Sequence, residues 1–269
     1  MARERRRVVL DRIRMSSLVQ PCEPSPATDH SPLAPMIRKL QLWKKLDDDE
    51  CAGLLALPHE VEELAPSAYV VREGQKTEHS CLLISGFAFR QKIARSGARS
   101  INAVHMQGDI VDLQNSLLGR ADHSVQALTR ARIARIPREA IVALAFQFPN
   151  LGMAMWYDTL VDASVFREWI LNIARRDAQT RIAHLLCEFG VRLESLGLSD
   201  RSSYEFPMTQ EQLADATGLT PVHVNRSLRE LEERGLITRT ARYLCVADWS
   251  LLKQAGEFDV AYLHLEGAQ

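Results

Sequence analysis

The stretch "MTQEQLADATGLTPVHVNRSLRELEERGLI", Met208 to Ile237, decides the fold, because it predicts two short capped helices joined by a sharp turn. Thr209 and Gln212 have the spacing of a capping box at the start of the first helix. Gly218 stands where that helix must end, and Thr220 is a suitable N-cap for the second one. Two short helices connected in this way form a helix-turn-helix.

The second of these helices has an inner and an outer face. Val224, Leu228 and Leu231 recur at spacings of four and three, which predicts a buried stripe. In a helix-turn-helix, the N-terminal half of the second helix meets the base edges of double-stranded DNA. We therefore interpret the outer face as a DNA-reading surface, with a merely solvated polar face as the alternative. The residues expected to contact DNA are Thr209, Gln210, Thr220, Val222, His223, Asn225, Arg226 and Arg229.

The residue types on this face suit DNA contacts. Asn225 can pair with adenine and Arg226 with guanine, and Val222 can touch a thymine methyl group. Thr209 and Gln210, at the start of the first helix, suit phosphate. Downstream, "LITRTARYLCVA" predicts a two-stranded wing. Because residues 201–250 hold six Arg or Lys residues and seven acidic ones, we expect two half-sites in a dimer to share the phosphate contacts.

Composition excludes several classes of protein. The chain has 269 residues, of which 46% are hydrophobic, and no apolar run approaches the roughly 20 residues that span a membrane. A cytoplasmic location is therefore expected. The sequence contains no GxSxG, HExxH, GxxxxGK[ST] or GxGxxG motif, so we do not expect an enzyme. No CxxC pair occurs among the five cysteines, so the sequence supports no metal site of closely spaced thiolates.

Composition and pattern divide the chain into five parts. Residues 1–35 form a basic and Pro/Ser-rich stretch that predicts a disordered tail, or in part an extension upstream of a start at Met15. Residues 36–148 begin with helical patterns and continue with short strand-like runs, such as "SCLLIS", "DIVDL" and "SVQALT", which predict an antiparallel barrel or roll. The remaining parts are a long helix over 149–176, a helical domain with the wing over 177–253, and a tail over 254–269.

The long helix predicts a dimer. Ala163, Phe166, Ile170 and Ile173 follow one another at spacings of three, four and three, which is the pattern of a coiled-coil contact line. Other apolar residues lie off this line, so the helix must pack on more than one body. We expect a partner helix on one side and the strand domain on the other. A core helix inside a monomer is the alternative.

The sequence resembles the Crp/Fnr superfamily of bacterial transcription regulators over about residues 36–250. The resemblance is carried by "REGQ", "LLISG", "MQGDI", "TRIAHLL" and the helix-turn-helix. It implies an α+β protein with an N-terminal antiparallel β-roll of the cyclic-nucleotide-binding type, a long dimerisation helix and a C-terminal winged helix-turn-helix. It also implies a homodimer that binds pseudo-palindromic promoter sites and acts with RNA polymerase.

This resemblance also implies where an effector would bind, and the sequence departs from the family there. Asp112 stands near the acidic position of the phosphate cassette, His123 and Ser124 occupy the place of an Arg-Ser pair, and Arg120 lies three residues earlier. The base-binding pair on the long helix falls at Phe166 and Arg167. A cyclic phosphate needs a well-placed cation, so we do not expect cyclic AMP. A cyclic-nucleotide-responsive regulator with an atypical cassette, and a regulator controlled by its abundance, are the alternatives.

The cysteines and histidines of the sequence bear on the other cofactors of the family. An iron–sulfur centre needs a cysteine cluster near the N-terminus, where the chain has Cys22 alone, so we do not expect one. Haem stays open because candidate ligands exist at His59, His79, His105, His123 and His184. The recognition helix departs from the family too, with Pro221 and Val222 where relatives often carry Arg or Ser and then Glu. The resemblance therefore predicts a DNA half-site that differs from the best-known ones.

Overall fold

The structure is a computed structural model that describes residues 31–240 and 242–265, so the first 30 residues of the expected tail lie outside the described part. The helices are α2 (Ala34–Leu40), α3 (Asp48–Leu55), α4 (Asn115–Leu118), α5 (Arg138–Gln147), α6 (Pro149–Arg175), α7 (Ala178–Ser195), α8 (Gln210–Thr217), α9 (Pro221–Glu233), α10 (Trp249–Ala255) and the 3-10 helix η2 (Val260–Leu263). The strands are β1 (Glu60–Leu64), β2 (Tyr69–Val71), β3 (His79–Ser85), β4 (Ala88–Ile93), β5 (Arg99–His105), β6 (Ser124–Ala127), β7 (Ala131–Pro137), β8 (Ser203–Glu205), β9 (Ile237–Thr240) and β10 (Tyr243–Val246). This is the predicted α+β class.

The N-terminal strands form two antiparallel sheets, with the orders β1-β7-β3 and β2-β6-β4-β5. Both faces of β3 are buried, because alternate side chains point to opposite sides of a strand. Leu83 packs inside the roll with Ile133, whereas Leu82 packs with Ile136 and the helices. The predicted roll is therefore confirmed. The run "DIVDL" is not a strand as predicted, because it makes an isolated bridge between Ile110 and Leu82 and then enters a turn.

The first described helix begins earlier than the sequence pattern predicts. Leu33 and Met36 are fully buried, and α2 starts at Ala34. The apolar run "PLAPMI" (32–37) explains this, since it supplies enough buried surface to offset the cost of ordering it. The helix α2 thus packs with the roll and α5 in one core.

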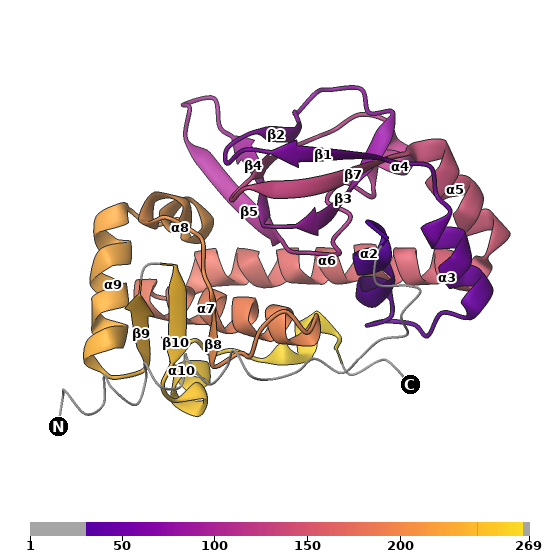
Figure 1. Cartoon of the computed structure of the whole chain (residues 1–269). Helices are drawn as coiled ribbons and strands as arrows, with labels where there is room; N and C mark the ends of the chain where they lie inside the picture. Colours follow the sequence, from indigo (N-terminus) through magenta and orange to yellow (C-terminus); the bar gives the residue numbers. More distant parts are fainter. Residues whose placement is uncertain (1–30, 241, 266–269) are drawn as a thin grey trace. The chain divides into compact units, whose positions relative to one another are not determined.

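The long helix α6 contains 27 residues and starts with Pro149 at its first turn. In Figure 1 it passes along the roll and then beside α7. Val161, Val165 and Trp169 are buried on one side of it and join a core shared with α7. After α6 ends at Arg175, Asp177 caps the next helix, α7. Its carboxylate accepts a hydrogen bond from Thr180 N.

Two C-terminal segments differ from their predicted states. The predicted two-stranded wing has a third strand, because β8 lies within the polar segment "LSDRSSYEF" (198–206) and extends the sheet to the order β8-β10-β9. Tyr204 drives this, because its ring is fully buried and its hydroxyl donates to Leu186 O. The expected tail after residue 253 is also packed: Phe258 and Leu263 are buried, and η2 lies against α6.

Candidate functional site

The helix-turn-helix has the predicted start and stop signals. Thr209 and Gln212 form the capping box of α8, with both reciprocal hydrogen bonds present. Gly218 ends α8 in the left-handed conformation at φ +66°, which favours glycine. Thr220 then caps α9, and its hydroxyl accepts from His223 N over 3.3 Å. These caps fix the angle at which α9 leaves the turn.

The inner face of α9 is apolar and its outer face is open. Val224, Leu228 and Leu231 are almost completely buried against the domain core. Because this stripe is anchored, the opposite face of the helix must point to solvent. Val222 on that outer face is 75% exposed, which is unusual for a large apolar residue without a partner.

A groove runs along the outer face between α8 and α9. It is lined by Gln210, Pro221, Val222, Asn225, Arg226, Arg229, Glu230 and Glu233. Five of the eight residues predicted to contact DNA meet there, while Thr209 and Thr220 are engaged in the caps. His223 is exposed but does not line the groove.

The polar groups of the groove are paired with one another. Arg226 Nε lies 2.8 Å from Glu230 Oε1, and both side chains are exposed. Asn225 Nδ2 donates to Gln210 Oε1 over 3.2 Å. On the wing, Arg239 makes two hydrogen bonds to Glu232. A DNA phosphate or base must therefore compete with these internal partners for the arginines.

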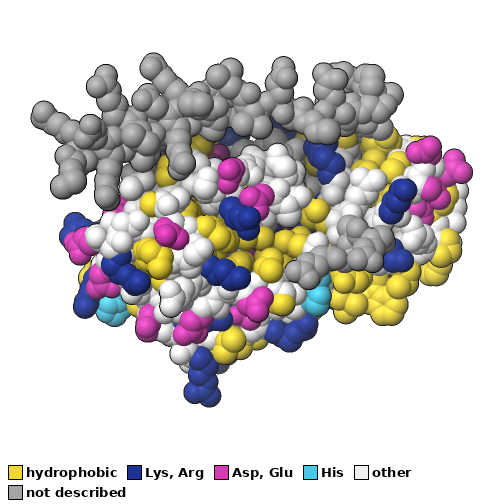
Figure 2. All heavy atoms as spheres, turned by 90° about the horizontal axis from the view of Figure 1, so that it is seen from below, with side chains coloured by type: hydrophobic (Ala, Val, Ile, Leu, Met, Phe, Trp, Pro, Cys, Tyr) yellow, Lys and Arg dark blue, Asp and Glu magenta, His cyan; other side chains and the backbone are white. Residues whose placement is uncertain are grey.

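Charge elsewhere is mixed. On the face drawn in Figure 2, Lys and Arg side chains are interspersed with Asp and Glu side chains and do not gather into a continuous basic stripe. This agrees with a formal net charge of −1. Binding of a polyanion would thus depend on the few cations at the groove and the wing.

Most of the residues predicted for an effector pocket have partners outside that set. Asp112 is buried and its carboxylate accepts from Cys81 N over 2.7 Å. Arg120 is exposed and donates to Gly74 O. His123 Nδ1 lies 2.6 Å from Asp122 Oδ1, and Ser124 Oγ accepts from Glu73 N. Phe166 lies under the Arg90 guanidinium at 4.2 Å, and Arg167 is exposed on α6.

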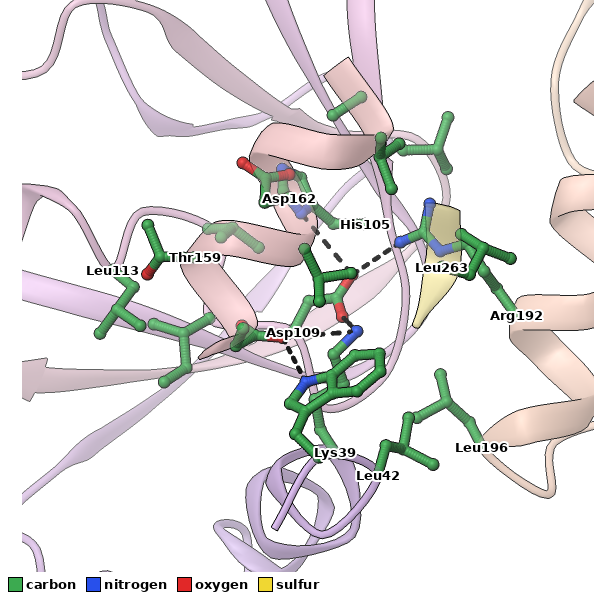
Figure 3. Close-up of a pocket in the computed structure, with 18 of the residues that line it drawn as sticks. Lys39, Leu42, His105, Asp109, Leu113, Thr159, Asp162, Arg192, Leu196 and Leu263 are labelled. Carbon is green, nitrogen blue, oxygen red and sulfur yellow. Dashed lines mark hydrogen bonds and ion pairs between the residues drawn. The ribbon is translucent and has the colours of Figure 1, made fainter. Parts of the chain in front are cut away.

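A different cavity lies between the roll, α2, α6 and α7 (Figure 3). Asp109, on the turn after β5, is its centre: Oδ1 lies 2.8 Å from Lys39 Nζ and Oδ2 lies 3.2 Å from Arg192. The Arg90 guanidinium binds the Asp162 carboxylate through two hydrogen bonds of 3.0 and 3.1 Å. Ion pairs therefore line the cavity.

Burial and charge together set the ionisation of this cluster. Burial alone would raise the pKa of Asp109, but the charges of Lys39 and Arg192 hold it well below its usual range. Burial raises the pKa of Asp158, which lies 3.8 Å from Lys39 Nζ. Burial also lowers the pKa of His105. Asp109 is thus an anion held by two cations from different elements.

Sequence reasoning missed most of these residues. Asp109 belongs to the quoted motif "MQGDI", but no role was assigned to it. Asp158 and Asp162 gave a usable signal, because they lie four residues apart in a stretch, residues 149–166, that has no other charged side chain. Arg90 and Arg192 gave no signal for the cavity, since the aspartates that they bind there are 72 and 83 residues away in the chain.

A second polar cluster links α6, α7 and the C-terminal segment. The Glu188 carboxylate accepts from Trp169 Nε1 over 2.9 Å and from the Tyr262 hydroxyl over 2.8 Å. Arg192 Nη1 lies 3.4 Å from the same carboxylate. Because Arg192 also binds Asp109, contacts run without a break from the roll to the C-terminal segment.

Among the histidines that stay open as haem ligands, His184 is fully buried. Burial lowers the pKa of His184 to about 4, and its two ring nitrogens lie 3.1 Å from Gly256 O and 3.2 Å from the Tyr262 hydroxyl. Within residues 31–240 and 242–265, no group of three His, Cys, Asp or Glu side chains is arranged to hold a metal. Cys22 lies outside that part of the chain. In the same part, no helix is both long and apolar enough to cross a membrane.

Comparison with known proteins gives the same two-domain pattern. A model of the Crp-like helix-turn-helix domain matches residues 180–255, and a model of the cyclic nucleotide-binding domain matches residues 61–148. The nitrogen fixation regulation protein FixK of Azorhizobium caulinodans is 25% identical over 89% of this chain and 97% of its own length. The transcriptional activator FnrL of Cereibacter sphaeroides is 26% identical over 82% of this chain and 90% of its own length.

Solved structures share the fold. FixK2 from Bradyrhizobium japonicum superposes with a TM-score of 0.68 at 20% identity, covering 74% of this chain and 98% of that one. The c-di-GMP responsive regulator CLP of Xanthomonas campestris gives a TM-score of 0.60 at 16% identity, covering 75% and 100%.

Proposed function

Because the chain belongs to the Crp/Fnr superfamily and is a transcription regulator with a helix-turn-helix DNA-binding domain, we propose that it binds a pseudo-palindromic promoter site as a homodimer and needs no cyclic AMP to do so. The observation that carries this proposal is the exposed groove between α8 and α9. It brings an amide, an apolar side chain and two arginines together on the face that the domain core leaves free.

In this proposal α9 enters the major groove of DNA. Arg226 reads a base, because an arginine at this place on a recognition helix can donate two hydrogen bonds to guanine. Its partner Glu230 is on the same helix and is released when the base is engaged. The first turn of α8, with Gln210, contacts the phosphate backbone.

A stripe of exposed side chains on α6 supports a homodimer. Met153, Trp156, Leu160 and Ile170 are 45–65% exposed. With Ala163 and Arg167 between them they follow the alternating spacing of three and four residues that a two-helix contact requires. We propose that this set, the α6 stripe, packs against the same stripe of a second copy.

The α6 stripe differs from the contact line predicted from the sequence. Ala163 and Ile170 belong to both. Phe166 lies under Arg90 of the same chain, and the Ile173 side chain lies beside Gly218 in the turn of the helix-turn-helix. Both the predicted contact line and the α6 stripe follow the spacing of three and four residues. The sequence alone could therefore not tell which of the two the roll and α8 would cover.

The ion pairs of the roll support independence from cyclic AMP. Arg90, the buried cation that faces α6, is bound to Asp162 by two hydrogen bonds. Lys92 contacts Glu73, and Arg120 is exposed and donates to Gly74 O. To bind Arg90 or Lys92, a cyclic phosphate would have to displace the carboxylate that holds that cation.

The alternative is a cyclic-nucleotide-responsive regulator with an atypical phosphate cassette, and the match to the cyclic nucleotide-binding domain favours it. Calorimetry with cyclic AMP and cyclic GMP separates the two. Our proposal expects no heat of binding and no change in DNA affinity on adding either nucleotide. Saturable binding that strengthens the DNA complex would establish the alternative.

We also propose that the protein acts in the cytoplasm and contacts RNA polymerase, as a promoter-binding regulator would. The central test is fluorescence anisotropy with labelled genomic fragments over a series of salt concentrations. We expect a preferred site whose affinity falls steeply with salt, because bound phosphates release counterions. Arg226→Ala should weaken that site by ~1–3 kcal/mol and relax one base position. Equal binding to all fragments would contradict sequence-specific regulation.

A further inference from the structure

The two helices of the helix-turn-helix, α8 and α9, are joined across the groove by a pair of amide side chains. Gln210 is the first residue of α8, and Asn225 is the fifth residue of α9. Asn225 Nδ2 donates to Gln210 Oε1 over 3.2 Å, and both side chains line the groove. Asn225 is half-buried by this arrangement, whereas Val222 and Arg226 on either side are exposed.

Gln210 is free to make this contact because a different residue caps α8. The carbonyl oxygen of the Gln212 side chain accepts from Thr209 N, and Thr209 Oγ1 accepts from Gln212 N. The reciprocal cap is complete without Gln210. Arg226 does not compete for Gln210 either, since its guanidinium is paired with Glu230.

We propose that Gln210 is a positioning residue that sets Asn225 to read an adenine in the DNA half-site, an inference that rests on the proposed function. An asparagine amide offers one oxygen and two N–H groups. Gln210 takes one N–H, which leaves one N–H and the oxygen. This pair of groups matches adenine, whose N7 accepts the N–H and whose N6 amino group donates to the oxygen. Guanine presents two acceptors in the same place and does not match.

While Gln210 directs its own N–H groups to a phosphate, its contact with Asn225 fixes which way round the Asn225 amide lies. A rotated amide would bring Asn225 Oδ1 against Gln210 Oε1, and two acceptors facing one another repel. Gln210 keeps both N–H groups of its own amide for a phosphate next to the base that Asn225 reads. The Gln210 side chain thereby links a contact with the DNA phosphate backbone to the base contact of Asn225. It fixes which phosphate and which base are bound together.

Two substitutions of Gln210 test whether it positions Asn225 or only adds to the affinity for DNA. Gln210→Met keeps the length of the side chain and removes the acceptor. Gln210→Glu keeps an acceptor for Asn225 Nδ2 and adds a negative charge near phosphate. The measurement is the dissociation constant for the preferred site and for every single-base change in one half-site, by fluorescence anisotropy.

For the native protein we expect one position where changing adenine to guanine weakens binding by about tenfold or more. Gln210→Met should reduce this penalty to about threefold or less and leave the penalties at other positions unchanged. Gln210→Glu should weaken binding to all sequences by a similar factor and keep the penalty. Asn225→Ala should abolish the penalty, and adding Gln210→Met to it should cause no further loss at that position.

Gln254→Met, on the exposed side of α10, is the matched control for the chemical change and should bind as the native protein does. An unchanged penalty in Gln210→Met, its loss in Gln210→Glu, or no adenine-dependent position at Asn225 would each overturn the inference while leaving DNA recognition intact. A native protein without any base preference would instead overturn the proposed function, and the inference with it.

Discussion

Asp109 on the roll and Arg192 on α7 lie 3.2 Å apart in the cavity of Figure 3, and this pair joins the sensor-like domain directly to the DNA-binding domain. The same aspartate binds Lys39 of α2, and the same arginine binds Glu188. One buried cluster thus receives groups from α2, the roll and α7. A motion of the roll relative to α7 would have to break or rearrange these ion pairs.

The first prediction concerns the strength of this pair. Arg192→Met should lower the free energy of unfolding by about 3–5 kcal/mol, because it leaves Asp109 and Glu188 buried without one of their cations. Urea unfolding followed by circular dichroism measures the change. Arg130→Met is the matched control: it breaks the pair with Glu63 on the surface of the same roll and should cost less than about 1 kcal/mol. Equal costs for the two variants would contradict a structural role for the buried pair.

A second prediction concerns pH. Burial raises the pKa of Asp112 to about 7, whereas an unfolded aspartate titrates near ~4. Between these values the native state binds more protons than the unfolded state, so this group makes the protein less stable as pH rises from about 4 to about 7. Asp112→Asn removes the titration and keeps an oxygen that can accept from Cys81 N.

The variant should therefore gain stability relative to the native protein as pH rises, by up to about 1 kcal/mol per pH unit in that window. Urea unfolding at half-unit steps of pH measures it. His184, whose pKa burial lowers to about 4, acts in the opposite direction over the same range. The quantity to compare is therefore the difference in the free energy of unfolding between the variant and the native protein at each pH. A difference that does not vary with pH would show that Asp112 is ionised throughout.

Much of the fold and of the exposed face of α9 could be predicted from the sequence because their signals are local. A cap, a glycine turn and an apolar stripe each lie within a few residues, as at Thr209, Gly218 and Val224. The cavity could not be predicted, because Arg90 and Asp162 meet only when strand and helix pack. β8 was missed for the same reason, since burial of Tyr204 against α7 decides it and its neighbours are polar.

The third prediction concerns the release of Arg226. Glu230→Gln removes the ion pair that holds the Arg226 guanidinium and one negative charge from the groove. We expect DNA affinity to rise about twofold or more for all sequences, since an exposed pair at this spacing contributes ~0.3–0.5 kcal/mol and phosphate repulsion falls as well. Titrations at low and high salt measure the change, which should shrink as salt rises. Weaker binding would mean that Glu230 holds Arg226 in its reading position.

The fourth prediction concerns the α6 stripe. Leu160 is 53% exposed near its middle, and in the proposed dimer it faces the same residue or a close neighbour of the second copy. Leu160→Glu would place two like charges in an apolar contact, so we expect dissociation to monomers at micromolar concentration and at least tenfold weaker binding to a two-half-site fragment. Light scattering coupled to size exclusion, with anisotropy on the same samples, measures both effects. Leu251→Glu, at a leucine of similar exposure on α10, should change neither. Because Leu160 is remote from the groove residues in the chain and absent from the groove lining, affinity for a single half-site should be retained, and its loss would point to unfolding rather than to a broken interface.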